Sequence, residues 1–139
     1  MIYLITAILI NVILVFVATI FLDSMSILGF ISIIYFFPII MNITLSALAI
    51  DKGGKKGNYC YSFPSMSLIM YLIIGVLLYH SQSWINFIEN NVISSGEMYI
   101  RVNSNLLDLS QIIFVALLYF LVEFLCLKLI ERRNKYENN

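Results

Sequence analysis

Long apolar runs alternate with short polar stretches along this chain. Residues 2–22 and residues 27–50 contain no charged side chain. Each run is long enough for a helix, rising about 1.5 Å per residue, to cross the roughly 30 Å hydrocarbon core of a bilayer. The polar residues 23–26 between them predict a tight turn, in which Asp23 or Ser26 caps the next helix. The first half of the chain therefore predicts two antiparallel membrane helices.

Two further apolar runs predict two more membrane helices in the second half. They cover about 66–84 and about 106–130. The glycine- and lysine-rich stretch 51–65 cannot continue a lipid-exposed helix, so we expect a loop there, with Pro64 beginning the third helix. A charged tail, 131–139, ends the chain. The expected fold is an all-α, four-helix transmembrane bundle, a single integral membrane domain that includes the whole chain.

The stretch 85–105 is the longest polar segment between apolar runs. Apolar residues near its start recur at helical spacing, which predicts a short amphipathic helix on the membrane surface. Around Met98, apolar and polar residues alternate, which predicts a small hairpin or an extended lid. We expect this partly structured outer segment to face a partner. The residues predicted to face it are Trp84, Phe87, Glu89, Glu97 and Arg101.

The composition excludes an ordinary soluble domain. Of the 139 residues, 61% are hydrophobic and 12% are charged, whereas soluble proteins average roughly half and a quarter. The formal net charge is zero, which gives no electrostatic basis for binding nucleic acid. The two cysteines and the single histidine lack the spacing of a metal site, so we expect neither a metal nor another cofactor.

Seven of the eight basic residues lie in two clusters, which four crossings place on the same side of the membrane. The positive-inside rule predicts that this side is the cytoplasm. We therefore expect a multi-pass protein of the plasma (inner) membrane with both termini inside. Frequent Ile, Asn, Tyr and Lys indicate a low-GC bacterium. Six of the basic side chains are expected to contact anionic lipid: Lys52, Lys55, Lys56, Lys128, Arg132 and Arg133.

Glu123 is the only carboxylate well inside an apolar run. A charge at membrane depth is costly unless it is paired, hydrated or protonated. Counted from the helix centres, Glu123 and Asn42 both lie about 6 Å toward the cytoplasm. Asn11 lies near the centre of the first helix, and Tyr71 lies slightly cytoplasmic of the centre of the third. We predict that these four side chains form an intramembrane polar cluster.

Three interpretations of Glu123 remain open. It could hold helices together, it could reach water or Lys128 near the inner face, or it could bind a proton or a cation. Pro38 is expected to kink the second helix one turn before Asn42. Ser46 lies one turn beyond Asn42, on the same face. The second helix could therefore present several polar groups to Glu123.

Two functional hypotheses follow, and neither is enzymatic, because no nucleophile, base and orienting group occur together. The first is a protein that acts through helix–helix or outer-segment contacts with another membrane component, as an accessory subunit or an immunity-type protein. In architecture alone, the chain resembles some pore-forming bacteriocin immunity proteins. The alternative is a small oligomeric proton- or cation-coupled transporter using Glu123. Small multidrug exporters are similar in size, but their embedded glutamate is in the first helix, where this chain has Asn11.

Overall fold

Within its described residues, the computed structural model is helical over most of its length. Four helical spans are long and apolar enough to cross a membrane, which confirms the predicted class of protein. The residues described are 2–52, 56–91, 93–95, 98–100 and 103–137. For residues 56–58, 93–95, 98–100 and 131–137 only the backbone is described. The four spans are Ile2–Ile20, Ile27–Asp51, Tyr59–Leu78 and Leu109–Ile130.

The first two spans form the predicted antiparallel hairpin. Helix α1 (Ile2–Ile20) is followed by a single 3-10 turn, η1 (Leu22–Ser24). Helix α2 (Ile27–Ile31) begins where Ser26 accepts a hydrogen bond from the Gly29 N–H at 3.2 Å. Of the two predicted capping residues, Ser26 is therefore the cap, and it satisfies one of the amide groups that a helix start leaves without a partner.

The second span contains a break rather than a simple kink. Helix α2 continues into a π-helical segment, η2 (Ser32–Phe36), and then into α3 (Phe37–Asp51). Pro38 lies directly after the break, at the start of α3. Its ring cannot supply the backbone N–H that a continuous α-helix needs there. The irregularity predicted at Pro38 is therefore present as a π turn in the residues before it.

The third span begins earlier and ends earlier than its apolar run predicts. Helix α4 (Lys56–Leu78) starts inside the stretch expected to be a loop, 51–65, and Pro64 lies in its interior. The loop prediction and the end predicted at residue 84 were therefore wrong. The apolar pattern reports where lipid surrounds the helix, whereas the helix itself can continue into water, where lysine and glycine are tolerated.

The fourth span shows the same extension beyond its apolar run. Helix α6 (Leu109–Glu137) starts three residues later than the predicted 106 and continues through most of the expected tail, 131–139. Between α4 and α6 lie α5 (Gln82–Asn90) and two antiparallel strands, β1 (Ile93–Ser95) and β2 (Met98–Ile100). In this two-stranded sheet Ile93, the first residue of β1, lies opposite Ile100, the last residue of β2.

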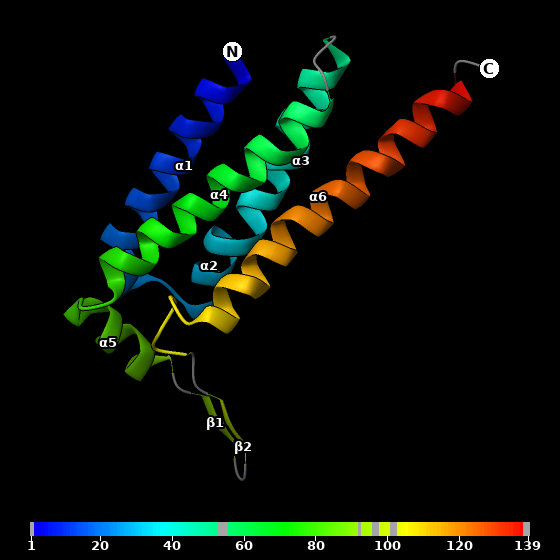
Figure 1. Ribbon diagram of the computed structural model, residues 1–139. Coiled ribbons are helices and arrows are strands. Elements are labelled where there is room, and N and C mark those ends of the chain that lie inside the picture. Colours follow the sequence, from blue (N-terminus) through cyan, green and yellow to red (C-terminus); the bar gives the residue numbers. More distant parts are fainter. Residues whose placement is uncertain (1, 53–55, 92, 96–97, 101–102, 138–139) are drawn as a thin grey trace.

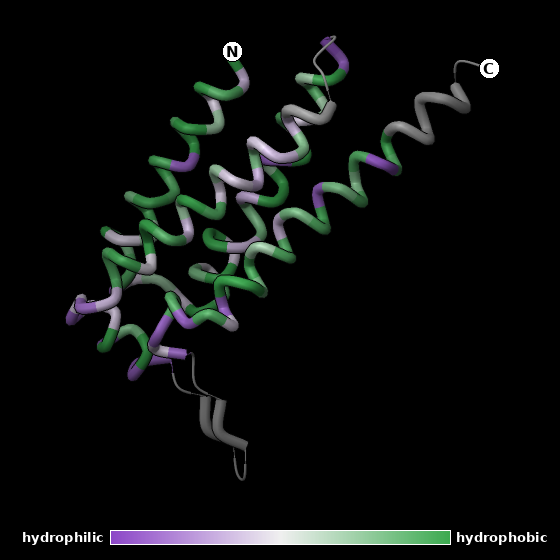
Figure 2. Tube along the Cα trace, viewed as in Figure 1, coloured by the Kyte–Doolittle hydropathy of each residue, from purple (hydrophilic) through white to green (hydrophobic). Residues whose placement is uncertain are grey.

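The bundle has two different ends (Figure 1). The start of α1, the end of α3, the start of α4 and the end of α6 lie at one end, whereas α5 and the strand pair lie at the other. Toward its C-terminus, α6 diverges from α4. Figure 2 shows mostly hydrophobic residues along the helices and hydrophilic residues gathered around α5 and the segment before α6. This distribution is the one expected when the helices cross a membrane and α5 meets water.

Candidate functional site

Glu123 is buried inside the protein. Its side chain is 1% exposed, and the Ser46 hydroxyl on α3 donates a hydrogen bond to its Oε1 at 2.5 Å. Its other oxygen, Oε2, has no hydrogen-bond partner. Lys128, five residues further along α6, is exposed, and no described basic side chain pairs with Glu123. The interpretation of Glu123 as a hydrated glutamate, or as the partner of Lys128, was therefore wrong.

A second buried hydrogen bond joins α4 to α3. The Ser67 hydroxyl donates to Asn42 Oδ1 at 3.1 Å, and both side chains are buried. Asn42 and Ser46 are one turn apart on α3, so they share a face of that helix. The four residues Ser67, Asn42, Ser46 and Glu123 form what we name the polar row, which crosses from α4 over α3 to α6. It joins three of the four spans.

Asn11 and Tyr71 are buried but do not join the polar row. The Asn11 side-chain amide donates to the carbonyl of Ala7, on its own helix, at 2.9 Å. The Tyr71 hydroxyl donates at 2.7 Å to the carbonyl of Leu106, just before α6. The predicted cluster was thus wrong in two of its four members. Depth along each helix could be estimated from the sequence, whereas helix rotation could not.

Several serine and threonine hydroxyl groups in the spans instead bond within their own helices. Five of them donate to a carbonyl four residues earlier, at 2.7 to 3.1 Å. Such a bond satisfies the hydroxyl in any environment and carries no information about neighbouring helices. By contrast, Ser46 and Ser67 bond other helices, so their contacts are tertiary. The five residues bonded to their own helix are Thr6, Thr19, Ser32, Thr44 and Ser65.

Tyr119 stabilises the irregular part of the second span. Its hydroxyl donates to the carbonyl of Ile34, in the π segment η2. In a regular helix that carbonyl would accept from the residue four positions on, which here is Pro38 and has no N–H. A polar group without a partner is costly in hydrocarbon. A proline inside a membrane helix predicts that another residue donates a hydrogen bond to the carbonyl four positions before it. Nothing in the sequence identifies Tyr119 as that donor.

The outer segment has the predicted short helix, α5, and the predicted hairpin, β1–β2, but two of its predicted partner-facing side chains are buried. Trp84 and Phe87 are each 2% exposed and pack around Phe30, with ring centroids 5.1 and 5.2 Å from it. They belong to the core, so the prediction that they face a partner was wrong. Glu89 is exposed on α5. The two remaining predicted contacts, Glu97 and Arg101, lie outside the described residues.

The basic residues predicted to contact lipid are described only in part. Lys52, directly after α3, and Lys128, on α6, are exposed. Exposure on the bundle surface leaves both free to meet lipid head groups, as the prediction requires. The side chains of the other four lie outside the described part of the structure: Lys55, Lys56, Arg132 and Arg133.

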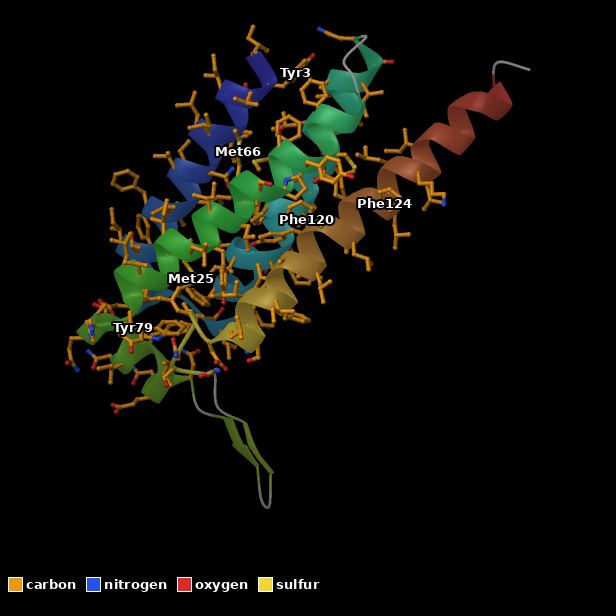
Figure 3. All side chains as sticks on the ribbon, viewed as in Figure 1. Tyr3, Met25, Met66, Tyr79, Phe120 and Phe124 are labelled. Carbon is orange, nitrogen blue, oxygen red and sulfur yellow. The ribbon has the colours of Figure 1, made fainter. Side chains whose placement is uncertain are left out.

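Two apolar grooves run along the bundle surface. One, of about 490 Å³, lies between α4 and α6, and Figure 3 shows Phe120 and Phe124 on that side of α6. The other, of about 300 Å³, lies between α1 and α4, beside Asn11. Both are almost entirely apolar, and they present space to lipid or to another helix rather than to a polar solute. The described residues contain no group of three or more His, Cys, Asp or Glu that could hold a metal ion.

Comparison with known proteins gives no assignment. No protein-family model matches the chain, and neither the curated proteins nor the solved structures give a match.

Proposed function

We propose that this chain is a non-enzymatic membrane protein that binds another membrane component through its outer segment. One observation carries this proposal: the β1–β2 strand pair extends away from the bundle (Figure 1). A two-stranded hairpin is only marginally stable in water by itself. Its outer edges present backbone groups that can pair with a further strand. A partner strand added there would complete a small sheet.

Helix α5 gives the β1–β2 strand pair, which we name the arm, a fixed base. Asn91, at its C-terminal end, accepts a hydrogen bond from the Ile27 N–H at 3.1 Å. Ser83, near its N-terminal end, donates to Asp23 at 3.2 Å. With Trp84 and Phe87 packed in the core, α5 is attached at both ends and along one face. A rigid base lowers the entropy cost of binding through the strands.

The proposed orientation places the arm outside the cell. The two basic clusters favour cytoplasmic termini, by the positive-inside rule. The arm and α5 would then lie on the outer face of a bacterial plasma membrane. An accessory subunit of a larger membrane assembly, or an immunity-type protein that meets a membrane-active toxin from outside, would use such an arrangement.

Photo-crosslinking in intact membranes tests this proposal. A photoreactive amino acid at Ser94, in β1, is expected to give one predominant protein adduct. The matched control, Leu117, is on the lipid-facing side of α6, with 60% of its surface exposed, and is expected to give only lipid adducts. Protein adducts at position 117 and none at 94 would instead favour lateral helix contacts. The absence of protein adducts at both positions would contradict the proposal.

Proton- or cation-coupled transport by an oligomer is a second candidate. It is favoured by the full burial of Glu123 without a described basic partner. Polar and ionisable groups held inside a membrane bundle often mark ion pathways. The apolar grooves provide surfaces through which chains could associate to enclose such a path.

A further inference from the structure

The carboxyl group of Glu123 has too few partners for a charged group. An ionised carboxylate has two oxygens that accept hydrogen bonds, with about four lone-pair directions between them. Here Oε1 accepts from Ser46, and Oε2, though buried, has no partner. A neutral carboxylic acid needs far less compensation for leaving water than a carboxylate does. The geometry therefore suits the protonated form.

The side chains described on the neighbouring helices supply no charge that would stabilise a carboxylate. On α3 the only described ionisable side chain is Asp51, which is exposed at the end of the helix. None of the tyrosine or lysine side chains described on η2, α4 or α6 bonds Glu123. These side chains are Tyr35 on η2, Tyr59, Tyr61 and Tyr71 on α4, and Tyr119 and Lys128 on α6.

The polar row gives the acid a defined place between helices. Ser46 donates to Oε1, so Oε1 takes the role of the carbonyl oxygen and Oε2 can carry the proton. One turn away, Asn42 is held by Ser67 from α4. Its side-chain nitrogen, which is also buried, has no partner. Within the polar row, Glu123 Oε1 therefore has a hydrogen-bond donor, whereas Oε2 and the Asn42 side-chain nitrogen have no partner.

We infer that Glu123, with Ser46 and Asn42, forms an intramembrane proton-binding site whose occupancy controls the packing of α6 against α3. With the proton bound, the acid packs against α3 as a neutral group. Loss of the proton leaves a buried carboxylate with a single donor, and α6 moves away from α3. The site does not depend on the outer-segment function proposed above.

Infrared spectroscopy of the purified chain in lipid vesicles detects the proton directly. At neutral pH we expect the carbonyl stretching band of a protonated carboxylic acid, which shifts in deuterated water and disappears in Glu123→Gln. Gln retains the size and neutrality of the acid, so the variant should fold. If the wild-type band is missing at neutral pH, or persists in Glu123→Gln, the inference is overturned. Removal of the band by sodium at constant pH would assign the site to a cation and would also overturn it.

Ser46→Ala tests the role of the hydroxyl group. Loss of the hydrogen bond to the carbonyl oxygen is expected to move the band to higher frequency without removing it. Thr44→Val is the matched control, because the Thr44 hydroxyl bonds the Ile40 carbonyl on its own helix. An unchanged frequency in Ser46→Ala, or an equal shift in both variants, would contradict the assigned geometry.

Spin labels test the coupling to helix packing. The chosen positions are Leu48 on α3 and Leu125 on α6, both about half-exposed, with the native cysteines replaced by alanine. At alkaline pH the distance between labels is expected to increase in the otherwise wild-type chain and to stay constant with Glu123→Gln. A distance that responds to pH equally in both would refute the coupling of protonation to packing.

Discussion

Trp84→Ala is expected to destabilise the bundle by about 3 kcal/mol or more, the usual cost of truncating a buried aromatic side chain. The indole ring packs against Phe30 and Phe87, and its N–H donates to the Ser104 carbonyl at 2.8 Å. Truncation removes the stacking and leaves that carbonyl without its donor. Because α5 lies at the end of the bundle, outside the four spans, its unfolding exposes apolar surface to water, and the full hydrophobic cost applies.

The neighbouring residue provides the control for this change. Ile85 is 46% exposed on α5, so Ile85→Ala is expected to cost less than about 1 kcal/mol. Circular dichroism during unfolding in mixed detergent micelles measures both variants without relying on tryptophan fluorescence. Equal losses for Trp84→Ala and Ile85→Ala would contradict the docking of α5 through its Trp84 face.

Tyr119→Ala is expected to cost about 2 kcal/mol, from a cavity among three spans and from the loss of the bond to Ile34. The side chain is 1% exposed. The cost is smaller than for a soluble core, because the unfolded helices remain in lipid and gain no contact with water. Tyr119→Phe retains the ring and is expected to cost only about 1 kcal/mol, which isolates the hydroxyl group.

The same unfolding experiment measures both tyrosine variants. Tyr61→Phe is the matched control, since Tyr61 is 68% exposed on α4 and should tolerate loss of its hydroxyl. If Tyr119→Phe is as stable as the unmodified chain, the Tyr119 hydroxyl does not compensate for the N–H that Pro38 lacks. If Tyr119→Ala is no worse than Tyr119→Phe, the ring does not pack in the core as described.

The number and order of the spans could be predicted from the sequence, but the helix ends could not. The length of an apolar run matches the thickness of the hydrocarbon core, so the four apolar runs predict the four spans of the structure. Backbone hydrogen bonding continues outside that core, so α4 extends back to Lys56 and α6 continues past residue 130. The π segment before Pro38 also follows from a local rule, because proline removes a backbone donor.

For the residues of the candidate site, only the depth along each helix could be predicted from the sequence. Depth counting placed Glu123 and Asn42 in one layer, and both belong to the polar row. Asn11 has a similar depth but bonds its own helix, because rotation about the helix axis decides which neighbour a side chain meets. Ser67 was missed for the same reason. Trp84 was predicted to face a partner and is buried instead. An aromatic residue in a polar stretch can lie in an interface or in the core, and the sequence does not distinguish the two.

The contact between Ser46 on α3 and Glu123 on α6 is the centre of the proposed site, and cysteine cross-linking tests it directly. In a chain with Cys60 and Cys126 replaced by alanine, Ser46→Cys and Glu123→Cys are combined and oxidised in membranes. We predict rapid disulfide formation between positions 46 and 123. No disulfide should form between positions 44 and 123, because Thr44 is exposed on another face of α3. Cross-linking at 44 and not at 46 would show that α3 presents a different face to α6 and would contradict the polar row.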